Sequence, residues 1–219
     1  MFERVLNSGL RTTTYKYGLL TAIVDYIIES SLEPPINNFH FIPIFHLAKQ
    51  FLAHYFPLIL VDIRQEPDLK EKSHTKIKNP ILDFVNSKEA KTQIPFLLIK
   101  ENTNQLISFI ESNEYLPIVL IKLLFDVRKI IVDQTLQYIR NVKGENASIF
   151  GLLSNVDSFQ SDYNDHRKTG LKLQWSEIKA VENWHELLEK ENLQLFFAHQ
   201  TFQEISQMRF WLRDVLIKR

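Results

Sequence analysis

Residues 15–29 read YKYGLLTAIVDYIIE, and their apolar side chains come in neighbouring pairs that recur every four residues. The paired positions are Leu19 and Leu20, Ile23 and Val24, and Ile27 and Ile28. An α-helix completes a turn in about 3.6 residues, so this spacing draws one apolar stripe along a helix. The stretch therefore predicts a helix that packs on a hydrophobic core.

The composition extends this prediction to the whole chain. Only 5 of the 219 residues are glycine, whereas β-sandwiches, phosphate-binding loops and doubly wound nucleotide folds need several. Hydrophobic residues make up 45% and charged residues 24%, which is the usage of an ordinary globular domain. We expect an all-α or mainly α fold, in the form of a compact multi-helix domain.

Further helices are predicted by the same period and by their boundary residues. A second helix is expected from Pro43 to Pro57, because proline is tolerated at a helix start and ends a helical run. A third is expected after Asn79 as the capping residue, with Pro80 as the first helical residue. Others are expected at 103–112, 117–140, 176–192 and 200–217. Residues 58–63, LILVDI, fit either a short strand or the start of another helix.

A polar segment bears on the domain organisation. Residues 64–78 are charged and almost free of aliphatic side chains, which is typical of a surface connection. We interpret residues 1–219 as a single mainly helical domain. In an alternative reading this loop joins two lobes, 1–63 and 79–219.

One region breaks the helical period. Near residues 147–175 the apolar residues Leu171, Leu173 and Trp175 alternate with lysine and glutamine, and two glycines lie in the same region. Alternation with a period of two is typical of a half-buried strand. The sequence therefore allows a small β-hairpin near 147–175.

The residue types argue against catalysis, metal binding and cofactors. The chain has no cysteine, which removes zinc knuckles and thiol nucleophiles, and no histidine pair has the spacing of a zinc protease. It has neither a Gly-x-Ser-x-Gly elbow nor a Walker loop. Glu186, Glu189 and Glu191 fit a solvated helix face, because acid–base catalysis needs a shielded pocket. We expect no catalytic residue, no metal and no cofactor.

A group of candidate phosphate ligands precedes the first helix. Arg11, Lys16 and the hydroxyls of Thr12, Thr13 and Thr14 stand where backbone N–H groups are free and the helix dipole is positive. Cations are unfavourable there unless an anion is bound, and Tyr15 offers a ring that can stack on a sugar or base. In the alternative interpretation the threonines only cap the helix, while Arg11 and Lys16 reach acidic neighbours or water.

Two other basic groups are weaker candidates for nucleic-acid contact. Arg167, Lys168 and Lys172 lie in the predicted hairpin, where Asp162 and Asp165 reduce the local field. Arg209 and Arg213 lie on the polar side of the last helix, where late cations also complement the helix dipole. Neither group is dense enough for strong phosphate neutralisation by itself.

Three stretches, taken in order, carry a family resemblance. They are TTTYKYGLLTAIVDYI (12–27), FHFIPIFHLAKQFLAHYFPLIL (39–60) followed by DIRQ (62–65), and FQEISQMRFWLRDVLIKR (202–219). Together they resemble the helical N-terminal region that precedes the nuclease motif in bacterial HNH endonucleases of the restriction or defence type. The resemblance implies a recognition or regulatory portion, because this chain lacks the ββα metal motif with its histidines and asparagine.

Two functions remain open on these grounds. The first is a non-catalytic DNA-recognition domain that partners or is fused to a nuclease domain or subunit, and that holds the phosphate backbone through the basic helix N-terminus. The second is a protein-interaction or oligomerisation module without nucleic-acid binding. With 26 basic and 26 acidic residues the net charge is zero, so no global field favours DNA or membrane. A cytoplasmic location, without membrane association, is expected.

Overall fold

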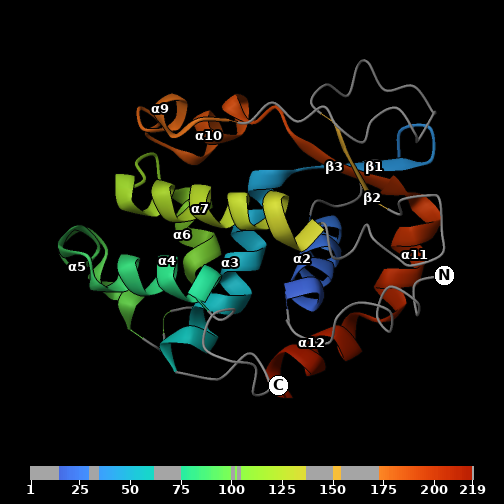
Figure 1. The fold of residues 1–219 in the computed structure, drawn as a ribbon, viewed down its shortest axis with the longest axis horizontal. Helices are drawn as coiled ribbons and strands as arrows, with labels where there is room; N and C mark the ends of the chain where they lie inside the picture. The colour runs from blue at the N-terminus through green and yellow to red at the C-terminus, as the bar shows by residue number, and fades with distance from the viewer. Residues whose placement is uncertain are drawn as a thin grey trace.

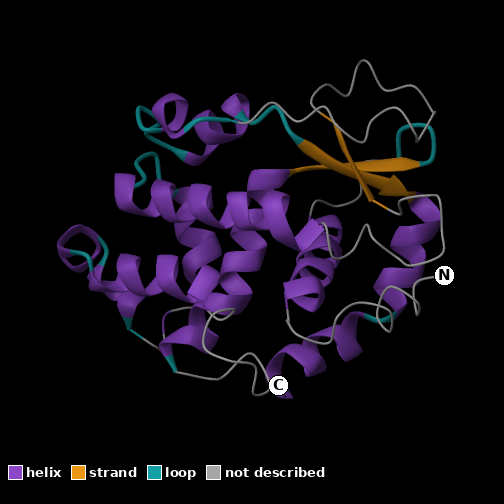
Figure 2. Ribbon diagram, viewed as in Figure 1, coloured by secondary structure: helices purple, strands orange, loops and turns teal. Residues whose placement is uncertain are grey.

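The computed structural model of the chain describes residues 15–29, 35–61, 75–99, 102, 105–136, 150–153 and 173–218. Most of these residues are helical, and three short strands form one small antiparallel sheet (Figure 2). The predicted mainly α fold is therefore confirmed.

The helices and strands follow one another along the chain as labelled in Figure 1. The helices are α2 Tyr15–Glu29, α3 Ile44–Leu60, α4 Thr75–Asn86, α5 Lys88–Gln93, α6 Leu106–Ser112, α7 Ile118–Ile130, α9 Trp175–Ile178, α10 Trp184–Lys190, α11 His199–Gln207 and α12 Arg209–Lys218. A 3-10 turn spans Pro95–Leu98 and a π-helical turn spans Ile131–Thr135. The strands are β1 Phe39–Pro43, β2 Phe150–Leu153 and β3 Gln194–Ala198.

Helix α2 has the predicted bounds, but it is buried on more than one side. It packs on α3 and on α12, and α3 in turn packs on α7. Leu19, Leu20 and Ile23 are fully buried, as the apolar stripe predicts. Ile28, the last residue of that stripe, is exposed, whereas Lys16 is buried. The helix therefore crosses the interior of the domain, and its polar residues cannot all reach water.

Helices α2 and α3 approach each other closely at Gly18. A methyl group built on Gly18 would lie 2.5 Å from the Tyr55 ring of α3, which is shorter than any normal contact. We predict that Gly18→Ala lowers the free energy of unfolding by about 1–2 kcal/mol, because the overpacking exceeds the helix-propensity gain of about 1 kcal/mol. Urea denaturation measures the change, and Gly18→Val should cost more. A more stable alanine variant would contradict the close approach.

Two prolines that were expected to bound helices lie inside them. Helix α3 continues through Pro57 to Leu60, and the Val61 N–H donates to the Pro57 carbonyl at 3.2 Å. Residues 58–60 are therefore helical and continue α3, so a strand at these residues was wrong, while residues 62–63 lie outside the described residues. Helix α4 begins at Thr75 rather than after Asn79, with Pro80 in its interior. Each proline removes one helical N–H, and tertiary packing of the apolar face outweighs that loss.

The two last predicted helices are each divided in two. In the 176–192 region, α9 and α10 have separate caps, and the Asn183 side chain accepts a hydrogen bond from the Glu186 N–H at 2.9 Å. In the 200–217 region, α11 ends at Gln207, and α12 begins after Met208. The break at Met208 turns α12 toward α2, which buries Leu212.

The sheet joins segments that are distant in sequence, with the strand order β1-β3-β2. Phe41 pairs with Phe196 in β3, and Gly151 of β2 pairs with Phe196 from the other side. Strand β2 lies within 147–175, but its partner is β3, so the described part of that region contains no hairpin. Trp175 begins a helix, and residues 154–172 lie outside the described residues.

The buried apolar side chains form one cluster. It includes residues from α2 and α3, which precede the polar segment 64–78, and from α7 and α10, which follow it. Helix α4 also contributes, and it begins within that segment: residues 75–78 are helical and Ile77 is buried, so this part was wrongly predicted as a surface connection. Among the described helices, none combines the length and the apolar character needed to span a lipid bilayer.

Candidate binding sites

Two of the residues predicted to contact nucleic acid at the start of α2 are buried. Lys16 is only 4% exposed, and its ammonium group lies 5.0 Å from the centre of the Tyr17 ring. Tyr15 is also buried, and its ring packs edge to face with that of Tyr55, with the ring centres 5.7 Å apart. The Tyr15 hydroxyl accepts a hydrogen bond from the Ile77 N–H at 3.3 Å. These two side chains therefore face the interior of the protein. A phosphate contact by Lys16, or stacking of Tyr15 on a base, stays a prediction that would require these side chains to leave their observed positions.

Arg209 is engaged in an ion pair that attaches α12 to α2. Its Nε and a terminal nitrogen lie 3.2 and 3.0 Å from Oδ1 of Asp25. Asp25 is buried, and its other oxygen lies 3.3 Å from Nε2 of His54. A carboxylate held between an arginine and a histidine neutralises the charge that Arg209 would offer to a phosphate. Arg209 thus fixes the position of α12.

The other predicted ligands cannot be placed in the same way. Arg213 lies in α12, and its side chain is outside the described part of the structure. The remaining candidates also lie outside the described residues: Arg11, Thr12, Thr13, Thr14, Arg167, Lys168 and Lys172. Of the predicted set the structure therefore places Tyr15, Lys16 and Arg209, and it does not bring them together on one solvent-facing surface.

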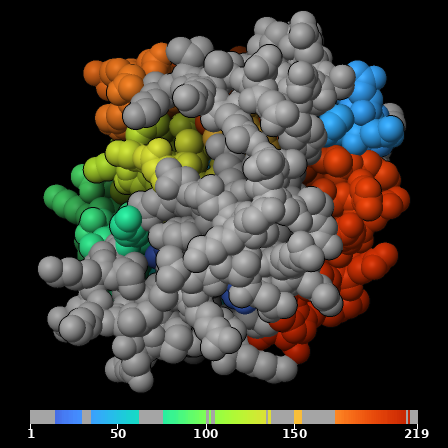
Figure 3. All heavy atoms as spheres, turned by 45° about the vertical axis from the view of Figure 1, so that its right-hand side comes forward, coloured from blue at the N-terminus to red at the C-terminus, as the bar shows by residue number. Residues whose placement is uncertain are grey.

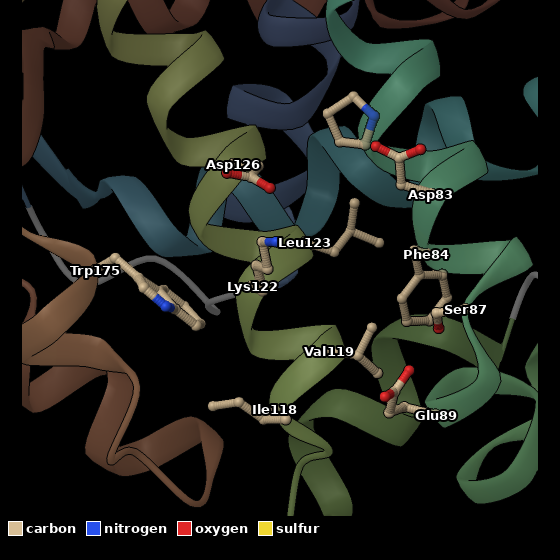
Figure 4. A pocket seen from close by; sticks show the side chains of 11 residues that line it. Asp83, Phe84, Ser87, Glu89, Ile118, Val119, Lys122, Leu123, Asp126 and Trp175 are labelled. Carbon is tan, nitrogen blue, oxygen red and sulfur yellow. The ribbon is translucent and has the colours of Figure 1, made fainter.

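A pocket of about 370 Å³ lies between α4 and α7, with Trp175 of α9 at its side. We call it the acidic pocket and define it by Asp83, Phe84, Glu89, Lys122, Asp126 and Trp175. Figure 4 shows Asp126 and Lys122 on α7, with Trp175 on one side of them and Asp83 of α4 on the other.

The acidic pocket contains more negative than positive side chains. The lining contains the carboxylates of Asp83, Glu89 and Asp126 and one ammonium group, that of Lys122. Asp126 is half-buried, whereas the other three charged side chains are exposed. Burial raises the pKa of Asp126 above its usual value, Lys122 and Lys129 oppose that shift, and Asp83 adds to it. Among the described residues, none forms a hydrogen bond or ion pair with Asp83, Lys122 or Asp126. The pocket therefore favours a ligand with positive charge.

The sequence indicated the α7 side of this pocket but not the α4 side. Lys122 and Asp126 interrupt an otherwise apolar run on α7, and charges there are costly unless that side of the helix reaches solvent. The contribution of α4 could not be predicted, because nothing in the sequence indicates which helix faces Asp126.

An exposed aromatic pair lies on α12. Phe210 is 81% exposed and Trp211 is 46% exposed, while the following residue, Leu212, is buried in the core. The Trp211 and Tyr17 rings pack in a T-shaped arrangement with their centres 5.8 Å apart, so the indole is anchored on α2. Figure 3 shows the C-terminal helices (red) along one side of the molecular surface. We call Phe210 and Trp211 the aromatic edge.

Two buried cations of the described helices, Arg128 and Lys49, are paired with carboxylates. Arg128 of α7 donates two hydrogen bonds to Glu191, from Nε at 2.7 Å and from a terminal nitrogen at 2.9 Å. Glu191 also accepts from the Leu193 N–H at 2.9 Å, and the guanidinium lies 5.5 Å from the Phe45 ring. Lys49 of α3 is likewise buried and pairs with Glu111 of α6. These contacts connect core elements, which is a structural role.

Four of the described histidines are buried or half-buried: His40, His46, His54 and His199. His46 stands between the rings of Tyr26 and Trp184, and burial, reinforced by Lys49, lowers its pKa to about 3. His40 Nε2 and His199 Nδ1 share a hydrogen bond of 2.8 Å. Burial and the neighbouring His199 lower the pKa of His40. Across the described ranges, no three histidine, aspartate or glutamate side chains converge as metal ligands.

These features define a mainly α domain with a small antiparallel sheet, an acidic pocket and an aromatic edge. Residues 2–219 match the family described as Domain of unknown function (DUF8808), so the chain belongs to this family. Neither a curated protein nor a solved structure matches the chain.

Proposed function

We propose that the chain is a protein-interaction module that associates with a second copy of itself through the aromatic edge on α12. The exposure of Phe210 is the observation that carries this proposal. Burying a phenylalanine side chain contributes about 1.5–3 kcal/mol, and in a twofold symmetric dimer each copy supplies the same surface. A zero net charge also removes long-range repulsion between copies.

The DNA-recognition hypothesis has weaker support from the described residues. Tyr15 and Lys16 are buried, and Arg209 is paired with Asp25, so a phosphate would have to displace these contacts. The relation to HNH endonucleases, and DNA contacts by residues 11–14 and 167–172, stay predictions from the sequence.

Sedimentation-velocity measurements over a range of concentrations test the proposal. The wild-type chain should show a monomer–dimer equilibrium, and Phe210→Ser should weaken the dimer at least about tenfold, because it removes the most exposed aromatic side chain of the surface. Tyr115→Ser is the matched control, since Tyr115 is exposed at 59% and lies outside α12. This control variant should dimerise like the wild type.

The same preparations separate the two functions. A wild-type chain that remains monomeric at all concentrations, or a Phe210→Ser variant that dimerises normally, would overturn the proposal. Retention of mixed-sequence duplex DNA at low salt, with a steep loss as salt rises, would instead favour the DNA-recognition hypothesis.

A further inference from the structure

We infer that the acidic pocket between α4 and α7 binds a small organic cation whose ammonium group is carried on an alkyl chain. This inference is independent of the proposed function. The residues that line the pocket belong to α4, α5, α7 and α9 and to the junction between α4 and α5, whereas the aromatic edge lies on α12, at the bottom of Figure 1.

The size and walls of the pocket suit an alkyl chain. A volume of about 370 Å³ falls within the range of small-molecule sites. Phe84 and Leu123 are buried residues of its lining, while Val119 and Ile118 extend the apolar wall toward solvent. Methylene groups placed against this wall would leave water, which is favourable.

The charges of the pocket select a cation. The lining contains three carboxylates and one ammonium group, so it has an excess of two negative charges when all four groups are ionised. Lys129, which lies outside the lining, also acts on Asp126 and offsets part of this excess. Asp126 is the most enclosed of the three, and its raised pKa reflects water lost from around the carboxylate. A bound ammonium would replace that water with a charge-assisted hydrogen bond.

Trp175 adds an aromatic wall. Its ring packs on that of Phe125, with the ring centres 5.6 Å apart, and this contact positions the indole beside the pocket (Figure 4). Indole is the most favourable aromatic partner for an organic cation, which it attracts through its π face. The pocket thus combines an apolar wall, an aromatic wall and excess carboxylate.

A bare metal ion fits the pocket less well. A divalent cation such as Ca²⁺ needs six to eight oxygen ligands converging on one point. The described carboxylates do not converge in groups of three, so Asp83, Glu89 and Asp126 line the pocket without forming such a ligand cage. An alkylammonium requires only a favourable potential, one or two acceptors and apolar surface.

Calorimetric titration with n-butylammonium chloride tests the inference, and 1-butanol is the neutral control of equal chain length. The wild-type chain should bind the cation and show no saturable binding of butanol. Asp126→Asn keeps the shape of the side chain and should weaken butylammonium binding about fivefold to tenfold. Asp133→Asn is the matched control, because Asp133 is exposed on the turn after α7 and does not line the pocket.

Two further titrants identify the source of the cation. Equal or tighter binding of N-acetyl-lysine methylamide would support a lysine side chain of a protein partner, while binding of the free amine alone would support a small metabolite. Equal binding of butanol and butylammonium, or wild-type affinity in Asp126→Asn, would overturn the inference. Titrations repeated with Phe210→Ser should be unchanged, so a failure of self-association does not affect this test.

Discussion

Replacing Glu191 by alanine is expected to lower the free energy of unfolding by about 3–5 kcal/mol, the cost of leaving a buried charge without its partner. The Arg128 guanidinium would remain in the core, beside the Phe45 ring, without an acceptor for its two short hydrogen bonds. The Leu193 N–H would lose its acceptor as well. Urea denaturation followed by circular dichroism measures the loss.

Two variants make this test specific to the buried pair. Lys190 and Glu186 form a partly exposed pair at 3.9 Å, so Lys190→Ala should cost less than about 1 kcal/mol. The double replacement Arg128→Met with Glu191→Leu removes both charges and should recover most of the loss. A loss below about 1 kcal/mol for Glu191→Ala would contradict the buried position of the pair.

Acidification is expected to destabilise the protein through His46. Its pKa is about 3 in the folded chain and about 6.5 in the unfolded chain, so between these values only the unfolded chain takes up the proton. The stability that a neutral His46 provides is therefore fully present above pH 6.5 and is lost as pH falls. By pH 4.5 the loss should reach about 2–3 kcal/mol.

The comparison of two variants isolates this contribution from that of the carboxylates. His46→Phe preserves a ring between Tyr26 and Trp184 and removes a buried Nδ1 that has no hydrogen-bond partner. Between pH 6.5 and 4.5 the free energy of unfolding of His46→Phe should fall by about 2–3 kcal/mol less than that of the wild type. His185→Asn, at an exposed position, should follow the wild type. Parallel curves for the wild type and His46→Phe would contradict the prediction.

The sequence predicted helices best where an apolar period is long and local. Helix α2 has the predicted bounds, and α3, α6 and α7 lie where helices were expected. The errors concern ends and breaks, such as Pro57 and Met208, because tertiary packing decides whether a helix continues past an unfavourable residue.

The strands and the pocket depend on contacts that no local pattern contains. Strand β1, FHFIP, and β3, QLFFA, are mostly apolar segments of five residues, which are too short for local periodicity to separate a strand from a helix. The acidic pocket needs Asp83 and Asp126 from two helices, and their proximity arises only from packing.

The burial of Lys16 was, in contrast, available from the sequence. Lys16 precedes Leu19 and Leu20 by three and four residues, so the helical period places it on the same buried face. Lys16 was expected to be exposed because lysine is usually exposed, and its spacing from Leu19 and Leu20 was not considered.

The position of β3 at the centre of the sheet has a consequence for synthesis of the protein. A ribosome releases β1 about 150 residues before β3, the strand with which β1 pairs. Strand β2 also pairs with β3, so neither edge strand has its partner until residues 194–198 emerge. Unpaired apolar strands invite association between chains. Premature termination before residue 194 should therefore yield polypeptides that depend on chaperones to remain in solution.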